Sequence, residues 1–145
     1  MFRNILIPTD GSPLATLAVD KGIEFARDIK AGVTVVTVIE PFHLVSGKPD
    51  QVSHTRSEYE TIARTEAARA LTDAELKANQ VGVPHQSVQV ESNEPFQAII
   101  DATEMHHCDL IMMASHGRRG ISALLLGSVT QKVLTHSRIP VLVYR

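Results

Sequence analysis

The sequence predicts an α/β fold in which helices cover both faces of a single doubly wound, five-stranded parallel sheet. Short apolar runs alternate with longer segments of helical periodicity, in the order βαβαβαβαβ. Nearly all of the strand segments are apolar throughout, which is typical of parallel strands buried on both faces. Two turns that follow predicted strands, "PTDGS" and "MASHG", are polar and contain glycine. The usual strand orders for such a sheet are 3-2-1-4-5 and 2-1-3-4-5.

The first strand is predicted at residues 3–8, where a buried apolar run ends in a proline. Ser12 is a favourable N-cap and Pro13 a favourable first residue for the helix that follows. Gly32 is expected to close that helix. The β-branched run "VTVVTVIE" then predicts the second strand at residues 33–40.

Residues 41–54 have no clear period and contain Pro, Gly and Ser, which predicts a loop. A long apolar stripe of helical spacing runs from Tyr59 to Ala78, and the sequence Gly-Val-Pro stops it. The alternating segment "HQSVQVE" predicts the third strand at residues 85–91.

A helix with Pro95 near its start comes next, followed by the fourth strand at residues 109–114. Ser128 begins the last helix, and "IPVLVYR" at residues 139–145 is the fifth strand. No internal repeat or second core is visible, so residues 1–145 are expected to form one domain.

Composition excludes several classes of function. The chain of 145 residues has a formal net charge of −2 and no basic stripe, so no nucleic-acid partner is expected. No apolar stretch approaches the roughly 18 residues that cross a bilayer, and no signal peptide is expected. The single cysteine, Cys108, excludes an internal disulfide and fits a reducing compartment. A cytoplasmic protein without membrane contact is therefore expected.

The two polar turns indicate where a ligand would bind. In the order 3-2-1-4-5, strands 1 and 4 are neighbours and the chain reverses direction between them. Ligands of open α/β sheets bind outside the carboxyl ends of the strands at such a reversal. Both turns would border that crevice.

The start of the last helix has the features of an anion site. The N–H groups of Ser128, Val129 and Thr130 have no partner within a helix, and Gly127 lets the backbone approach a ligand closely. The alternative is that Ser128 only caps its helix, since Ser128 and Gln131 fit a capping box.

These residues carry a family resemblance. Universal stress proteins of the nucleotide-binding type have the motif G-x2-G-x9-G-[ST], and Gly117, Gly127 and Ser128 stand at that spacing, with Ala114 in place of the first glycine. The segments "ILIPTDGS", "VTVIE", "LLLGSVTQKVL" and "IPVLVYR" are similar to the family as well. The resemblance spans the whole chain and implies the strand order 3-2-1-4-5.

The resemblance implies a site for ATP, or for AMP or ADP, with or without Mg²⁺ or Mn²⁺, and no metal ligand from protein side chains. Val38 would offer backbone groups to the adenine edge, and Asp10 would line the adenosine end. The full set of implied nucleotide-binding residues is Pro8, Thr9, Asp10, Val38, Met113, Ala114, His116, Gly117, Gly127, Ser128, Val129 and Thr130.

Ala114 is the departure from the family pattern. If the backbone there is open to any residue, alanine adds only a methyl group. If it requires a positive φ, or if a ribose touches the Cα, alanine lowers affinity. Strand ends are usually extended, which favours tolerance.

Other polar patterns are interpreted as non-functional. The adjacent histidines of "MHHCD" point about 100° apart on a helix end, so they are not expected to share a metal with Cys108. Ser115 and His116 are neighbours in sequence without a nucleophile elbow, and are not expected to form a nucleophile and base. Arg118 and Arg119 could add positive charge to the anion site, but adjacent arginines in a loop are more often solvated, and that is the interpretation preferred here.

The function predicted is that of an ATP-binding regulatory protein in the stress response. The alternatives are an interaction module of the same fold without nucleotide, and an ATP hydrolase, which would be slow because no base or lysine is placed for it. The fifth strand is an apolar edge, and we expect it to pair with its own copy through Val141, Leu142 and Val143, unless another segment covers it. The resemblance implies the same homodimer.

Overall fold

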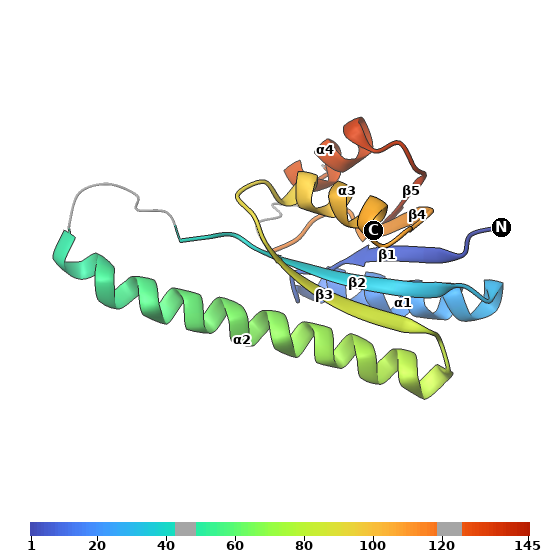
Figure 1. The fold of residues 1–145 in the computed structure, drawn as a ribbon, viewed down its shortest axis with the longest axis horizontal. Coiled ribbons are helices and arrows are strands. Elements are labelled where there is room, and N and C mark those ends of the chain that lie inside the picture. Colours follow the sequence, from blue (N-terminus) through green and yellow to red (C-terminus); the bar gives the residue numbers. More distant parts are fainter. Residues whose placement is uncertain (43–48, 119–125) are drawn as a thin grey trace.

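The computed structural model describes residues 1–42, 49–118 and 126–145, with side chains of the second helix described from residue 56 onward. Five parallel strands form one sheet in the order β3-β2-β1-β4-β5 (Figure 1), which confirms the predicted fold class and order. The strands are β1 (Asn4–Pro8), β2 (Gly32–Ile39), β3 (His85–Glu91), β4 (Leu110–Ala114) and β5 (Val141–Tyr144). The helices are α1 (Pro13–Ile29), α2 (Pro49–Val81), α3 (Pro95–Met105) and α4 (Ser128–His136).

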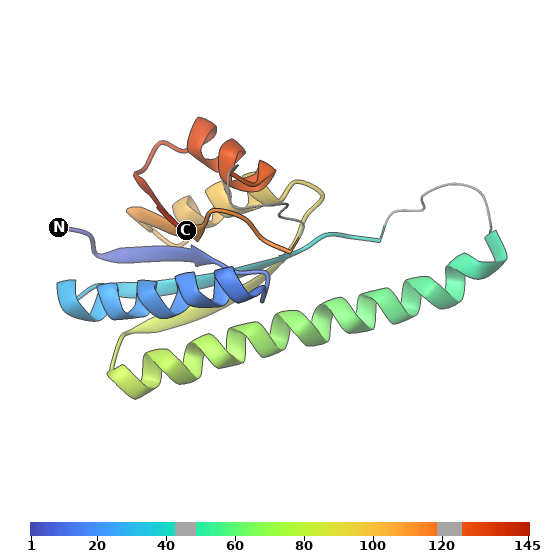
Figure 2. The ribbon, with the colours of Figure 1, turned by 180° about the vertical axis from the view of Figure 1, so that it is seen from behind.

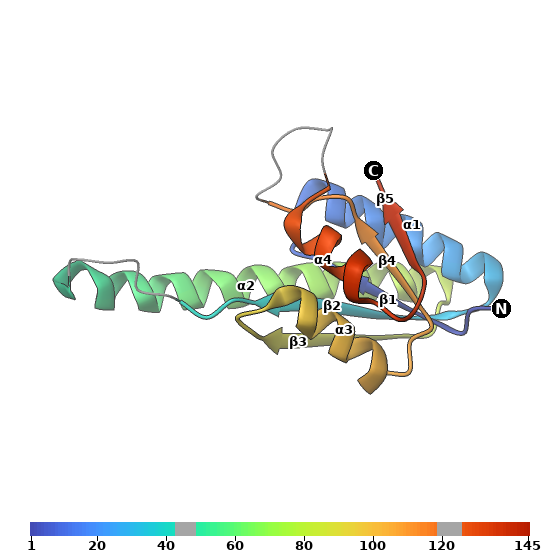
Figure 3. The ribbon, with the colours of Figure 1, turned by 90° about the horizontal axis from the view of Figure 1, so that it is seen from above.

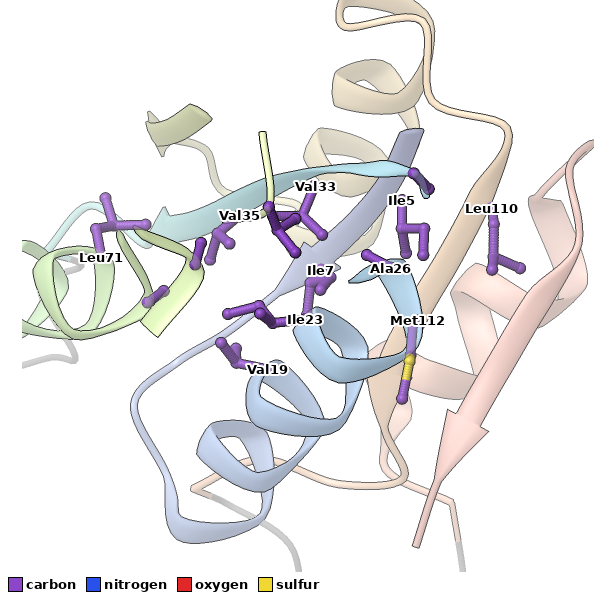
Figure 4. Close-up of a cluster of buried hydrophobic side chains, with 14 residues drawn as sticks. Ile5, Ile7, Val19, Ile23, Ala26, Val33, Val35, Leu71, Leu110 and Met112 are labelled. Carbon is purple, nitrogen blue, oxygen red and sulfur yellow. The ribbon is translucent and has the colours of Figure 1, made fainter. Parts of the chain in front are cut away.

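The helices cover the two faces of the sheet in pairs. Helices α1 and α2 lie on one face (Figure 2), and α3 and α4 lie on the other (Figure 3). On the first face, Ile5 and Ile7 of β1 pack with Val19 and Ile23 of α1 (Figure 4). On the second face, Leu6 packs with residues of α3, β4 and α4. Alternate side chains of β1 therefore enter separate cores, which is why that strand is apolar throughout.

Helix α1 begins as predicted and ends earlier than predicted. The Ser12 hydroxyl accepts a hydrogen bond from the Ala15 N–H at 3.4 Å, and Pro13 is the first helical residue. The helix ends at Lys30, which takes a left-handed conformation with φ of 60°. The expectation that Gly32 closes α1 was wrong, because Lys30 itself adopts the turn and Gly32 is already the first residue of β2.

Helix α2 starts well before the predicted helix. It begins at Pro49 and has 33 residues, equivalent to roughly 50 Å of helix. The prediction of a loop over 41–54 was therefore wrong for residues 49–54, and residues 43–48 lie outside the described part. The first half of α2 extends past the carboxyl ends of the strands (Figure 1), and the side chains described there, at residues 56–65, are exposed or half-buried.

None of the helices in the described part of the chain combines the length and hydropathy that a membrane span requires.

Candidate functional site

The carboxyl ends of β1 and β4 meet at the point where the sheet topology reverses. The two strands are neighbours, with Ile5 opposite Leu110 and Leu6 opposite Ile111. Strand β1 continues into α1 on one face, whereas β4 leads to α4 on the other. The two polar turns therefore lie together above the strand ends, at the place where open α/β sheets bind ligands; we call this region the crevice.

Asp10 connects the two turns. Its Oδ1 accepts a hydrogen bond from the Ser12 N–H at 2.9 Å, and its Oδ2 accepts one from the Arg118 N–H at 2.8 Å. A Cβ added to Gly117 would overlap Asp10 Oδ2. The glycine is therefore required here for space and not for a positive φ, since its φ lies outside the left-handed region.

Thr9 fixes the backbone of the first turn. It is buried, its N–H donates to the Val36 carbonyl at 2.9 Å, and its carbonyl accepts from the Thr37 hydroxyl at 3.0 Å. Its own hydroxyl accepts from the N–H of Gly11, whose φ of 75° suits glycine. The loop that carries Asp10, which follows the half-buried Pro8, is thus held by β2 as well as by its own turn.

The start of α4 is tied to the end of β4. The Gly127 N–H donates to the Ser115 carbonyl at 2.7 Å, and the Thr130 hydroxyl donates to the Ala114 carbonyl at 3.0 Å. No acceptor among the described residues is found for the N–H groups of Ser128, Val129 and Thr130. Three donors and the positive end of the helix dipole therefore lie at the crevice.

The capping box that was the alternative interpretation of Ser128 is absent. Gly127 is the N-cap of α4, and no side-chain hydrogen bond caps the helix. Ser128 is already the first helical residue and is exposed. A capping box needs the hydroxyl one position earlier, so the interpretation of Ser128 as a helix cap was wrong.

Gly127 also serves packing. A Cβ added there would lie 3.2 Å from the Cα of His116 and 3.4 Å from the carbonyl oxygen of Ser115. Such contacts are tighter than ordinary van der Waals contact. Substitutions of Gly127 would therefore disturb the β4–α4 connection as well as any ligand.

The methyl group of Ala114 points away from α4. Ala114 is buried and packs against Ala15 and Ala18 of α1. Its φ is not positive, since Lys30 and His107 are the non-glycine residues with positive φ in the described part. Met113, the preceding residue, faces the α3–α4 core. Alanine therefore fits this strand end without strain and without entering the α4 side of the crevice.

Val38 lies beyond the end of β1. The carbonyl of Val36 accepts from the Thr9 N–H, so even-numbered residues of β2 direct their backbone groups toward β1. Strand β1 ends at Pro8, opposite Val36. The N–H and C=O of Val38 consequently point toward the crevice, which fits a backbone reader of a ligand edge, while its side chain packs on the α3–α4 core.

Ser115 and His116 are in contact, contrary to expectation. The Ser115 Oγ lies 3.2 Å from the His116 Nδ1, and the serine is buried. The chain leaves the sheet here, which lets two consecutive side chains turn toward each other. His106, His107 and Cys108 form no group suited to a metal ion within the described residues.

Arg118 is not simply solvated, as had been expected. Its backbone N–H binds Asp10, and its guanidinium forms an ion pair with Glu66 of α2. Arg118 also lines a cleft of about 220 Å³ between α1 and α2, as do Thr9 and Gly11. No pattern in the sequence links Arg118 to Glu66, because they come from separate elements. Arg119 lies outside the described residues.

The model of the universal stress protein family matches residues 1–145. A universal stress protein of Thermus aquaticus is 33% identical, with all of both chains covered. The universal stress protein MJ0531 of Methanocaldococcus jannaschii is 30% identical, with 100% of this chain and 83% of the relative covered. Among solved structures, MJ0577 has a TM-score of 0.76 at 28% identity, covering 99% of this chain and 95% of that one.

Proposed function

This chain belongs to the universal stress protein family, and from that premise we propose that it binds ATP and acts as a regulatory protein whose partner contacts depend on the bound nucleotide. The observation that carries the proposal is the set of N–H groups at the start of α4 for which the described residues offer no acceptor, beside the contact of Asp10 with the Gly117–Arg118 segment. Free backbone donors at a helix N-terminus suit a phosphate.

Each end of the nucleotide has residues suited to it. The phosphates would lie on Gly127, Ser128, Val129 and Thr130, and the adenine edge would meet the backbone of Val38. Pro8, Thr9 and Asp10 would line the adenosine end, and Met113, Ala114, His116 and Gly117 the segment between. Mg²⁺ or Mn²⁺ would be held by the phosphates. Solved universal stress proteins include a complex with cAMP and one from Archaeoglobus fulgidus with dAMP, which supports an adenine nucleotide.

The same proposal includes a cytoplasmic homodimer formed by β5. This strand pairs with β4 and lies at the edge of the sheet. Leu142 is 38% exposed, and Val141 and Val143 are half-buried. An apolar edge without a charged side chain favours pairing with a second copy.

Gently purified protein tests the nucleotide directly. Native mass spectrometry is expected to show a bound adenine nucleotide. Added ATP with Mg²⁺ should then raise the melting temperature, because a ligand at a hundred times its Kd stabilises the folded state by about 2.7 kcal/mol. GTP should do less, since the backbone at Val38 would read the purine edge. The absence of any shift at millimolar ATP would favour an interaction module without nucleotide.

A further inference from the structure

Arg118 is anchored at its backbone and engaged at its side chain by different elements. The N–H binds Asp10 at the end of β1, and the guanidinium pairs with Glu66 on α2. Between these two contacts the Arg118 side chain passes Gly11, where an added Cβ would lie 3.4 Å from Arg118 Nη2. The backbone anchor holds the residue at the crevice whatever the side chain does.

The ion pair with Glu66 is open to exchange. The two side chains are 49% and 45% exposed. Ion pairs at that exposure contribute little to stability, because water solvates both charges and ordering long side chains costs entropy. A phosphate is a stronger partner for a guanidinium, which binds it through two parallel hydrogen bonds.

A phosphate at the start of α4 lies within reach of this side chain. A Cβ added to Gly127, the N-cap of α4, would lie 3.2 Å from the Cα of His116, so these two residues are neighbours in space. Arg118 is two residues further along the chain, a span of at most about 7 Å, and its long side chain covers a comparable distance. The guanidinium can therefore turn from Glu66 to phosphates bound at α4.

The charge of a polyphosphate favours such a cation, in addition to any Mg²⁺ or Mn²⁺ that the phosphates hold. The end of a helix is equivalent to about half an elementary charge, which suits a single phosphate but does not balance two or three. We propose that Arg118 determines the number of phosphates that the site accepts, by binding the outer phosphates of ADP and ATP in exchange for Glu66. This inference rests on the proposed nucleotide site and assigns it a preference for ADP and ATP over AMP.

Calorimetry with ATP, ADP and AMP on four proteins tests the exchange. The proteins are the wild type, Arg118→Gln, Arg118→Lys and Glu66→Gln. All variants keep the N–H that binds Asp10, and both positions are exposed, so the fold is expected to remain, as circular dichroism would verify.

Arg118→Gln is expected to weaken the binding of ATP about tenfold, equivalent to 1.4 kcal/mol. The binding of AMP should weaken less than twofold. Arg118→Lys should retain part of the preference for ATP. Glu66→Gln should raise the affinity for ATP two- to threefold, because the carboxylate that competes for Arg118 is gone. The affinity for AMP should not change.

The outcomes separate this inference from the proposed function. If Arg118→Gln weakens the binding of ATP and AMP equally, or if Glu66→Gln weakens the binding of ATP, the proposed exchange is wrong but the nucleotide site stands. If the wild type binds none of the three nucleotides at millimolar concentration, the proposed function is wrong and the inference fails with it.

Discussion

Asp10 Oδ2 occupies the space that a side chain at position 117 would need. The carboxylate can be there only because residue 117 is glycine, and it holds the N–H groups of Ser12 and Arg118 at 2.9 Å and 2.8 Å. The contact joins the turn after β1 to the turn after β4. Asp10 and Gly117 are 107 positions apart in the sequence, but the two strands that precede them are neighbours in the sheet.

Gly117→Ala should therefore destabilise the fold through Asp10. The carboxylate must move, and each hydrogen bond that it accepts contributes about 1 kcal/mol, so a loss of about 1–2 kcal/mol is expected. In an Asp10→Ala background the same substitution should cost much less, because the overlapping atom is absent. Urea unfolding of the four proteins in this cycle measures the coupling. Equal costs in both backgrounds would contradict the mechanism.

Ser128→Asp should separate helix stability from nucleotide binding. Helix α4 has no acidic residue in its first turn, so a carboxylate there is expected to stabilise the helix by about 0.3–1 kcal/mol through the dipole. The same charge repels a phosphate held at the neighbouring N–H groups, and ATP affinity should fall at least about tenfold.

The matched control for that variant is Ser128→Asn, which has the same shape without the charge. It should bind ATP nearly as well as the wild type, since the backbone carries the contact and the Ser128 hydroxyl forms no cap. Equal Kd values for the Asp and Asn variants in calorimetry would place the phosphates elsewhere.

Ala114→Gly should change stability and not affinity. The methyl group packs against Ala15 and Ala18, away from α4. Its removal loses a buried methyl and adds backbone entropy to the unfolded state, together about 1–2 kcal/mol. ATP affinity is expected to stay within about twofold. A tenfold gain in affinity for the glycine variant would show that the methyl obstructs the nucleotide.

The buried parts of this fold could be predicted from the sequence, because burial leaves a pattern in it. β1, β2 and β4 pack on both faces, so their apolar runs identified them within one residue at either end. Residues 49–58, at the start of α2, have no apolar stripe, so the sequence did not mark them as helix, and this part of α2 extends beyond the sheet (Figure 1).

The candidate site could be predicted only in part, for a related reason. The spacing of Gly117 and Gly127 is local and visible in the sequence. The ion pair of Arg118 with Glu66 joins two elements that are far apart in the sequence, and no periodicity records it. The position of the Ala114 methyl also needed the structure, because the face on which a strand residue lies depends on its neighbours.

The open edge of β5 is defined by its hydrogen-bond pattern with β4. The carbonyls of Pro140 and Tyr144 accept from the N–H groups of Ile111 and Ser115, at 3.0 Å and 2.7 Å. The backbone N–H and C=O groups of the even-numbered residues of β5 thus point toward β4. Those of Val141 and Val143 point toward the open edge.

Val143→Pro should therefore dissociate the proposed dimer without disrupting the sheet. Proline removes the outward N–H at the edge, where prolines are tolerated, and leaves the bonds of the even-numbered residues to β4 intact. Light scattering should give a dimer of the 15.9 kDa chain for the wild type and for the control Val143→Ala, and a monomer for the proline variant. Val141 is less suitable for this test, because its side chain packs on the α3–α4 core. A folded proline variant that keeps the dimer mass would show that the two copies meet through another surface.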